Sequence, residues 1–317
     1  MRSTNPADPA RSRLLRAACA LPAVACIPTT PAAQSLPSPS RRRMNTRPIP
    51  STGEPLPVIG CGTYVGFDQT PGTPAYGLLP GVVDALLDAG GKVLDSSPMY
   101  GRAEETTGEL LAASGRRGEA FLATKVWTTG RADGVRQMEA SMRLLRTDRI
   151  DLMQIHNLVD WRTQLATLRR WKDERRIRYI GITHYTPSAY AEVEAVLRAE
   201  RGIDFLQIDY AIDDREAERR LLPLAAERGI AVIVNMPFGG GGLLRRLLPR
   251  PLPPWSSEIG CASWAQILLK FVLSQPAVTC AIPGTRRREH MEDNATAGRG
   301  DVPGAAFWRT RLDDIVR

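Results

Sequence analysis

From residue 51 onward, short apolar runs rich in β-branched residues alternate with longer segments in which apolar residues recur at helical spacing. The apolar runs predict strands at Pro57–Tyr64, Lys92–Ser97, Ala120–Val126, Ile150–Asn157, Tyr179–Tyr185, Phe205–Ile212, Ala231–Phe238 and Val278–Thr285. The segments between and after them predict helices at Gly81–Ala89, Ala103–Ala113, Gly134–Arg146, Trp161–Arg176, Ser188–Glu200, Glu216–Arg228, Ser263–Ser274 and Arg288–Ala297.

This alternation predicts an α/β protein with a parallel sheet, because a strand that returns through a helix lies parallel to its predecessor. Pro187 opens the fifth predicted helix and Gly229 closes the sixth. Eight such units in about 250 residues are typical of a closed (β/α)8 TIM barrel. A doubly wound open sheet is the alternative, but Gly60 and Gly62 lack the third glycine of its usual phosphate-binding turn.

The first 50 residues differ in composition from the rest, with nine of the 25 prolines and eight arginines against one acid. Such a segment buries too little apolar surface to offset the entropy of ordering it, so we expect a disordered tail. The modest apolar stretch Ala17–Ile27 makes a weak signal-like segment the alternative reading. The predicted organisation is a tail at 1–50, a single barrel domain at 51–300 and a short C-terminal segment at 301–317.

Composition and charge exclude several classes of protein. No apolar run reaches the ~20 residues that span a bilayer. The net charge is +8, of which residues 1–50 carry +7, so the barrel is nearly neutral and unsuited to a nucleic-acid surface. The five cysteines include no CxxC pair and do not indicate a disulfide framework. The three histidines lack the spacing of metal ligands and do not indicate a metal site. We expect a cytoplasmic protein, or a periplasmic or secreted one if the signal-like segment acts.

Four reactive side chains lie at predicted strand ends, where the chemistry of a (β/α)8 barrel is found. Asp95 and Tyr100 belong to LDSSPMYG, Lys125 ends FLATKVW and His156 lies in DLMQIHN. Taken singly, each has an ordinary explanation as a cap, a packed ring, a solvated charge or a core histidine. Lys125 is the exception, because a lysine in an apolar strand needs a carboxylate partner, and Asp95 is the nearest candidate.

Together the four residues predict proton transfer to a developing alkoxide. A tyrosine has a pKa near 10, too high for proton exchange at neutral pH. An ammonium about 4 Å away stabilises the phenolate by roughly 4 kcal/mol at an effective dielectric of 20. We therefore expect Lys125 to lower the pKa of Tyr100 by up to about 3, Asp95 to hold the lysine, and His156 to orient a carbonyl oxygen.

The chain resembles the aldo-keto reductase superfamily from about Leu56 to Asn294. The resemblance is carried by IGCGTY, LDSSPMYG, ATKVW, DLMQIHN, IGITHY, LQIDY and AIPGTRRREHMEDN, each at an expected strand end. It implies an Asp-Tyr-Lys-His tetrad at Asp95, Tyr100, Lys125 and His156. It also implies metal-free, reversible reduction of an aldehyde or ketone with a nicotinamide cofactor, usually NADPH.

The resemblance also implies cofactor contacts, but only some of these positions carry the residue types usual in the family. The family holds the nicotinamide amide with a Ser-Asn pair and a Gln; this chain has Thr183, His184 and Gln207 at those positions. Where the family often has a stacking aromatic, Asn235 or Met236 stands here. The remaining expected contacts are Gly62, Thr63, Pro237, Gly239, Thr285, Arg286, His290 and Asn294.

The basic run Arg286–Arg288 bears on the choice of cofactor, because arginine binds phosphate in bidentate geometry. We expect Thr285 and Arg286 to bind a 2′-phosphate, which favours NADPH over NADH. The glycine run Gly239–Gly242 is either a pyrophosphate cradle or a plain flexible loop.

The substrate is not set by the sequence. Small aldehydes are the default expectation, with Tyr64, Trp127 and Trp161 as candidate lining residues. Two other functions remain open, namely a non-catalytic nicotinamide-binding regulatory or redox-sensing protein and an unrelated metal-dependent barrel hydrolase. The oligomeric state is also open.

Overall fold

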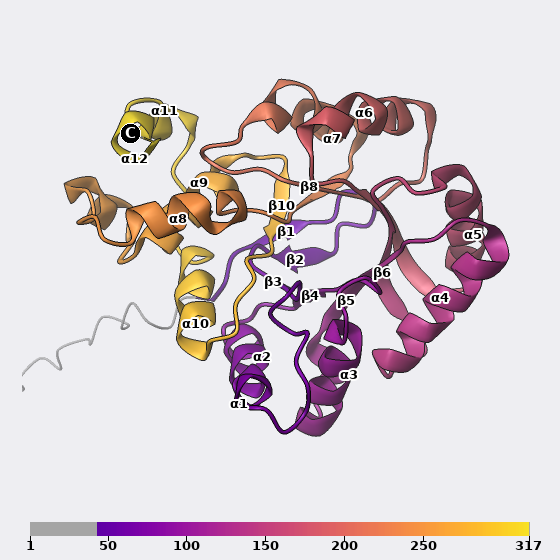
Figure 1. The fold of residues 1–317 in the computed structure, drawn as a ribbon. Coiled ribbons are helices and arrows are strands. Elements are labelled where there is room, and N and C mark those ends of the chain that lie inside the picture. Colours follow the sequence, from indigo (N-terminus) through magenta and orange to yellow (C-terminus); the bar gives the residue numbers. More distant parts are fainter. Residues whose placement is uncertain (1–42, 317) are drawn as a thin grey trace, which may run out of the picture. The chain divides into compact units, whose positions relative to one another are not determined.

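Eight parallel strands follow one another around the computed structural model, which describes residues 43–316 (Figure 1). They are β3 (Cys61–Gly62), β4 (Val93–Asp95), β5 (Phe121–Val126), β6 (Ile150–His156), β7 (Ile177–Thr183), β8 (Phe205–Ile208), β9 (Ala231–Val234) and β10 (Val278–Ala281). Single parallel bridges, Ile59 to Ala281 and Gly62 to Gly284, join the last strand to the first. The predicted (β/α)8 barrel is confirmed.

The helices surround the barrel in the predicted order. They are α1 (Pro74–Gly77), α2 (Leu79–Asp88), α3 (Ala103–Ser114), α4 (Arg131–Leu144), α5 (Trp161–Asp173), α6 (Tyr190–Ala199), α7 (Leu221–Arg228), α8 (Gly242–Leu247), α9 (Trp264–Ser274), α10 (Arg288–Ala297), α11 (Ala305–Arg309) and α12 (Leu312–Val316). Each predicted helix has a counterpart among them. The short helices α1, α8, α11 and α12 were not predicted, because four to six residues show no clear period.

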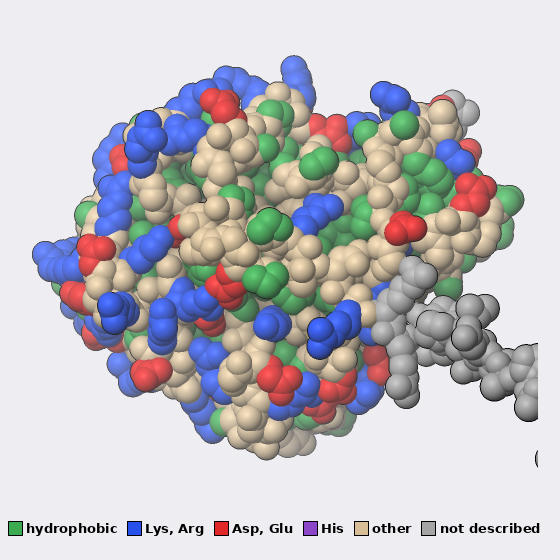
Figure 2. All heavy atoms as spheres, turned by 180° about the vertical axis from the view of Figure 1, so that it is seen from behind, with side chains coloured by type: hydrophobic (Ala, Val, Ile, Leu, Met, Phe, Trp, Pro, Cys, Tyr) green, Lys and Arg blue, Asp and Glu red, His purple; other side chains and the backbone are tan. Residues whose placement is uncertain are grey.

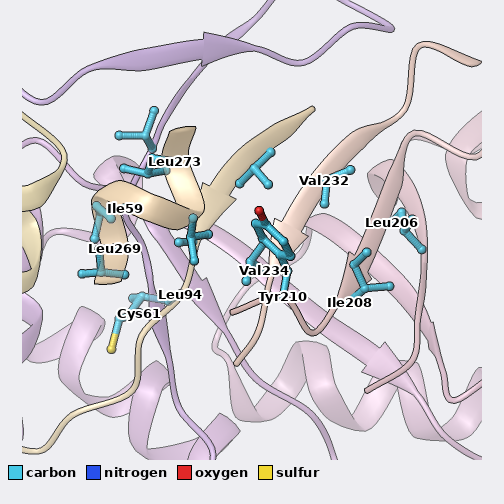
Figure 3. Close-up of a cluster of buried hydrophobic side chains, with 14 of the residues drawn as sticks. Ile59, Cys61, Leu94, Leu206, Ile208, Tyr210, Val232, Val234, Leu269 and Leu273 are labelled. Atoms are coloured by element: carbon cyan, nitrogen blue, oxygen red, sulfur yellow. The ribbon is translucent and has the colours of Figure 1, made fainter. Parts of the chain in front are cut away.

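Strand alternation divides the apolar residues into two cores. Leu94, Leu206 and Val234 belong to the larger cluster, outside the strands, in which Figure 3 shows Leu206 beside Ile208, on the other side of the view from Leu269 and Leu273 of α9. Phe121 and Phe205 belong to a second cluster, which fills the barrel interior. The interior is therefore a packed core, and polar chemistry is confined to its ends.

A hairpin of β1 (Thr46–Pro48) and β2 (Pro55–Pro57) lies at the start of the described chain. Ile49 and Leu56, on this hairpin, are buried in the interior cluster with residues of the barrel strands. Asn45 Nδ2 donates to the carbonyl of Gly300 at 2.7 Å. The predicted tail boundary at residue 50 is therefore wrong for residues 43–50, which are ordered; the signal-like segment lies outside the described residues.

The first barrel strand is shorter than predicted. Between Pro57 and Tyr64 only Cys61–Gly62 forms ladder pairs with β4. A Cβ at Gly60 would lie 2.7 Å from the Cβ of Val93, and one at Gly62 would lie 2.9 Å from the carbonyl oxygen of Ile282. The chain thus approaches both neighbouring strands more closely than a side chain allows, and glycine permits this at the cost of regular pairing.

The C-terminal segment packs on the outside of the barrel. Trp308 of α11 is buried, with its ring 5.5 Å from Phe271 of α9 and 6.1 Å from Trp255. These contacts hold the segment beside α9.

The surface of the described residues carries charges of both signs. Lys and Arg side chains are dense on the edge formed by α4 and α5, interspersed with acids (Figure 2). Among the described residues, no helix is long and apolar enough to cross a membrane.

Candidate active site

Inward-facing polar side chains form a layer at the C-terminal ends of the strands, here called the barrel mouth. Leu94, Val126 and Ile155 belong to the outer core, so the alternating residues Asp95, Lys125 and His156 face inward. Because the three strands are neighbours, the alternation that builds the core also gathers the predicted tetrad.

Asp95 and Lys125 form a fully buried ion pair. Lys125 Nζ donates to Asp95 Oδ2 at 2.6 Å and to the carbonyl oxygen of Ser96 at 2.7 Å. The lysine is 0% exposed and the aspartate 2%. Burial alone would lower the pKa of Lys125, but the adjacent carboxylate and phenol outweigh it and raise the pKa. The ammonium is therefore charged at neutral pH.

Two glutamines complete the environment of the carboxylate. Gln154 Nε2 and Gln207 Nε2 donate to Asp95 Oδ1 at 3.0 and 2.8 Å. Gln207 Oε1 in turn accepts from Thr183 Oγ1 at 3.3 Å. Gln154 was missed by the sequence analysis, although its place two residues before His156 on one strand gives it the same inward face. A Cβ at Gly181 would lie 2.8 Å from Gln154 Cγ, so this glycine makes room for the amide.

Tyr100 lies beside the ion pair as predicted. Lys125 Nζ lies 5.1 Å from the centre of its ring, and the ring meets that of His156 edge-on at 6.0 Å. The expected low pKa is wrong for this structure. Burial raises the pKa of the Tyr100 phenol and outweighs the lowering by Lys125, and the Asp95 charge adds to the rise. The lysine offsets part of the burial penalty without making the phenol acidic.

His156 is neutral at physiological pH. Burial, together with the nearby Lys125 charge and His184, lowers its pKa to about 3. Its Nδ1 lies 3.1 Å from the hydroxyl of Ser97, a buried residue that the sequence analysis did not single out. The indole ring of Trp127 lies 6.4 Å from the imidazole.

Exposed apolar side chains surround the tetrad. Tyr64 is 64% exposed and its ring lies 4.9 Å from that of Tyr100, while Trp127 is 42% exposed. Both therefore lie at the mouth, as expected of lining residues. Trp161, at the start of α5, packs against the outer core and beneath Arg162, and its ring makes no contact with the rings of Tyr100 and His156 in the described part of the chain.

The expected nicotinamide contacts come from the ends of β3, β7 and β8. Thr63 is buried, and its N and Oγ1 both donate to the carbonyl of Asp95 at 3.0 Å. Thr183 and Gln207 are bonded to each other as described. His184 is half-buried, and its Nδ1 accepts from the backbone N–H of Tyr185 at 3.1 Å. Nε2 then carries the proton and is a donor.

The turn after β9 contains the next expected residues. Pro237 is buried, and Gly239 to Gly241 form a short 3-10 helix with positive φ angles of 55°, 64° and 83°. A Cβ at Gly239 would lie 2.5 Å from Asp213 Oδ1. The run is thus a tight turn leading into α8. Asn235 Oδ1 is buried without a hydrogen-bond partner among the described residues.

The last group lies after β10. Thr285 Oγ1 accepts from the N–H of Arg287 at 3.1 Å and lies 3.5 Å from His290 Nδ1. Arg288 pairs with Glu292 at 2.7 Å, whereas Arg286 is exposed and pairs with no carboxylate among the described residues. Asn294, on the same helix as His290, is buried. The Arg286 guanidinium is therefore not neutralised by a carboxylate in the described part of the chain.

Comparison with known proteins identifies the family. The sequence profile of the Aldo/keto reductase family matches residues 59–300. The chain belongs to the aldo/keto reductase family. The family is one of oxidoreductases. The residues Asp95, Tyr100, Lys125 and His156 all lie within the matched region.

Relatives of this aldo/keto reductase include curated enzymes and solved structures. It is 29% identical to methylglyoxal reductase YeaE of Escherichia coli, over 76% of this chain and 84% of that protein. It is 28% identical to aldo-keto reductase str7 of Strobilurus tenacellus, over 68% and 75%. A Klebsiella pneumoniae aldo-keto reductase in complex with NADPH has a TM-score of 0.73 at 25% identity, covering 86% of this chain and 94% of that one. Another, with NADP and acetate, has a TM-score of 0.71 at 26% identity, covering 83% and 92%.

Proposed function

We propose that this aldo/keto reductase uses NADPH to reduce a small aldehyde or ketone to an alcohol, with Tyr100 as the general acid. The observation that carries the proposal is the buried Lys125 ammonium, held by Asp95 and 5.1 Å from the Tyr100 ring. A cation is costly to bury, and here it faces the one phenol whose ionisation it stabilises.

The residues at the mouth suit a nicotinamide dinucleotide. Asn235 Oδ1 is a buried acceptor that lacks a donor among the described residues. His184 supplies a donor through Nε2, and Arg286 supplies a free guanidinium. When bound, the cofactor supplies a hydride to the carbonyl carbon.

The protein's own part is to bind the carbonyl oxygen and move one proton. Tyr100 is protonated at neutral pH because its pKa is raised, so it is in the acid form before the reaction. As negative charge develops on the substrate oxygen, the phenol gives its proton to that oxygen. Lys125 then faces the phenolate and stabilises it, which lowers the barrier to transfer. Neutral His156 places no competing cation beside the oxygen.

We propose NADPH over NADH because of Arg286. It lies in the loop between β10 and α10 and has no carboxylate partner among the described residues, whereas Arg287 and Arg288 pair with Glu289 and Glu292. A guanidinium free of a carboxylate is suited to a 2′-phosphate. The complexes of Klebsiella relatives with NADP and NADPH agree with this choice.

The test is a spectrophotometric assay with nitrobenzaldehyde and each reduced cofactor. We expect turnover with a higher kcat/KM for NADPH than for NADH. Tyr100→Phe should lower kcat at least about a hundredfold, the usual contribution of a general acid. Tyr76→Phe is the matched control: it removes a phenolic hydroxyl bonded to Glu109 on α3, away from the tetrad, and should leave kcat within about twofold of the native value.

Three other outcomes would contradict the proposal. Tight NADPH binding without turnover of a broad aldehyde panel would favour a regulatory or redox-sensing protein. Enzymatic activity that does not require NADPH and that a chelator abolishes would favour a metal-dependent hydrolase. Full activity in Tyr100→Phe would remove the phenol from the mechanism.

A further inference from the structure

The hydroxyl of Ser97 is enclosed between a histidine and a backbone amide. Ser97 is 0% exposed and lies two residues after Asp95, in the loop that leads to Tyr100. Its Oγ lies 3.1 Å from Nδ1 of His156, and the N–H of Met99 donates to the same oxygen at 3.4 Å. Among the described residues, Nδ1 of His156 is the one acceptor within hydrogen-bond distance of the hydroxyl proton.

The direction of the Ser97–His156 hydrogen bond follows from the burial of the serine. If Nδ1 carried the proton and donated to Oγ, the serine proton would have no acceptor among the described residues and no water, because the side chain is inaccessible. A buried donor without an acceptor is costly. If the hydroxyl donates to Nδ1, every group is satisfied, since Oγ also accepts from Met99. The second arrangement is the stable one.

We infer that Ser97 is a positioning residue that fixes the tautomer of His156 with the proton on Nε2. This ring nitrogen makes no hydrogen bond to the described residues, and it is not fully enclosed by protein atoms. His156 as a whole is 5% exposed.

The tautomer decides what His156 does to a carbonyl, and this step rests on the proposed function. A carbonyl oxygen held by Tyr100 needs donors around it, because it gains negative charge as the reaction proceeds. Nε2–H is a donor, whereas an unprotonated Nε2 would present its lone pair to the oxygen and repel it. Ser97 thus acts through His156 and never touches the substrate.

Nitrogen NMR of the native protein tests the tautomer without any assay. The chain has only three histidines, and protonated and unprotonated ring nitrogens are well separated in ¹⁵N shift, so the rings can be assigned in ¹⁵N-histidine-labelled protein. We expect His156 to be neutral with the proton on Nε2 at pH 7. His184, whose Nδ1 accepts from Tyr185 and Thr186 backbone amides, serves as an internal reference of the same tautomer. A proton on Nδ1 of His156 would overturn the inference.

Variants then assign the effect to the hydroxyl. Ser97→Ala should give His156 a mixture of tautomers, and Ser97→Thr, which keeps the donor, should restore the native spectrum. The matched control is Ser96→Ala, because the Ser96 hydroxyl is buried and bonds to nothing among the described residues. It should leave the tautomer unchanged. An unchanged tautomer in Ser97→Ala would overturn the inference, and the native spectrum alone decides it if that variant fails to fold.

Kinetics connect the tautomer to the reaction. Ser97→Ala should lower kcat for carbonyl reduction about tenfold, by analogy with the loss caused by removing the hydrogen-bond partner behind a metal-ligating histidine, while the Kd for NADPH measured by fluorescence stays the same. Loss of NADPH binding instead would indicate a collapsed site and contradict the inference. If the native protein shows the expected tautomer but reduces no carbonyl, the proposed function fails and the tautomer inference stands.

Discussion

At the scale of single residues, the site depends on where each hydrogen-bonding atom of Asp95 is directed. Oδ2 accepts from Lys125, and Oδ1 accepts from Gln154 and Gln207. The carboxylate is therefore held at both oxygens by side chains from three other strands. This arrangement holds the buried carboxylate in place and fixes the ammonium beside Tyr100, because neither partner can turn away without leaving an unpaired group.

The pKa directions at the site predict a flat pH profile for carbonyl reduction. His156 has a pKa of about 3 and stays neutral above that value, and the pKa of Tyr100 is raised, so the phenol stays protonated. We expect kcat for reduction to be constant between about pH 5 and about pH 9. Alcohol oxidation needs the phenolate as base, so its kcat should rise with pH over the same range.

The measurement for this prediction is kcat at saturating cofactor and substrate, with a deuterated cofactor to establish that hydride transfer limits the rate. A fall in the reduction rate centred between about pH 6 and pH 7 would assign the limiting proton to a histidine and contradict the prediction.

The residue types at the site were predictable, and their surroundings were not. Asp95, Tyr100, Lys125 and His156 stand at strand ends that the apolar pattern marks. Gln154 and Ser97 lie within the same motifs but were missed, because their roles depend on which atoms meet them across the barrel. The pKa of Tyr100 was predicted in the wrong direction, since a sequence gives the neighbouring charge but not the burial that outweighs it.

At the scale of elements, α3 packs against the C-terminal end of α4 through a glycine. A Cβ at Gly108 would lie 2.1 Å from the carbonyl oxygen of Leu144 and 2.9 Å from the Cα of Leu145. Both neighbours are backbone atoms, so the contact cannot be relieved by a change of rotamer. The two helices can approach this closely only without a side chain at residue 108.

Gly108→Ala should therefore destabilise the protein although alanine favours helices by about 1 kcal/mol over glycine. Overpacking costs about 1–3 kcal/mol, and contact with backbone atoms places this case at the upper end, so after the helix gain we expect a net loss of about 1–2 kcal/mol in the free energy of unfolding. Denaturant titration measures it. Gly77→Ala, at the end of α1 with nothing within 4 Å of the new Cβ, should stay within about 0.5 kcal/mol of the native protein. Equal stability of the two variants would mean that α3 shifts freely.

Element boundaries were predicted less well than the elements themselves. The helix Arg288–Ala297 matches the prediction, because its apolar spacing is regular, whereas β3 shrinks to Cys61–Gly62 where glycines bring the backbones together. The hairpin β1–β2 was missed because its strands contain Pro48, Pro55 and Pro57, residues that argue against sheet unless an edge position accommodates them.

At the scale of the described barrel, stability and chemistry lie at opposite ends. The tetrad and the expected cofactor contacts lie at the C-terminal ends of the strands. The hairpin packs Ile49 and Leu56 into the barrel interior, below the polar layer. Arg47 donates to the carbonyls of Leu273, Gln275 and Val278, so the same segment also joins α9 to β10. This division is typical of (β/α)8 barrels.

Two truncated chains test whether the hairpin contributes to stability alone or also to catalysis at the barrel mouth. A chain that starts at Met44 keeps the hairpin, whereas one that starts at residue 51 loses β1, Ile49 and the Arg47 hydrogen bonds. Burial of an isoleucine contributes about 2 kcal/mol and each lost hydrogen bond about 1 kcal/mol. Thermal unfolding should therefore show the second chain to be less stable by about 3–5 kcal/mol.

At a temperature where both truncated chains are folded, their kcat for nitrobenzaldehyde should agree within about twofold, because nothing at the mouth has changed. A large loss of kcat in folded protein would show that the hairpin supports the polar layer directly, since Ile49 packs in the same interior cluster as Ala123, two residues before Lys125 on β5.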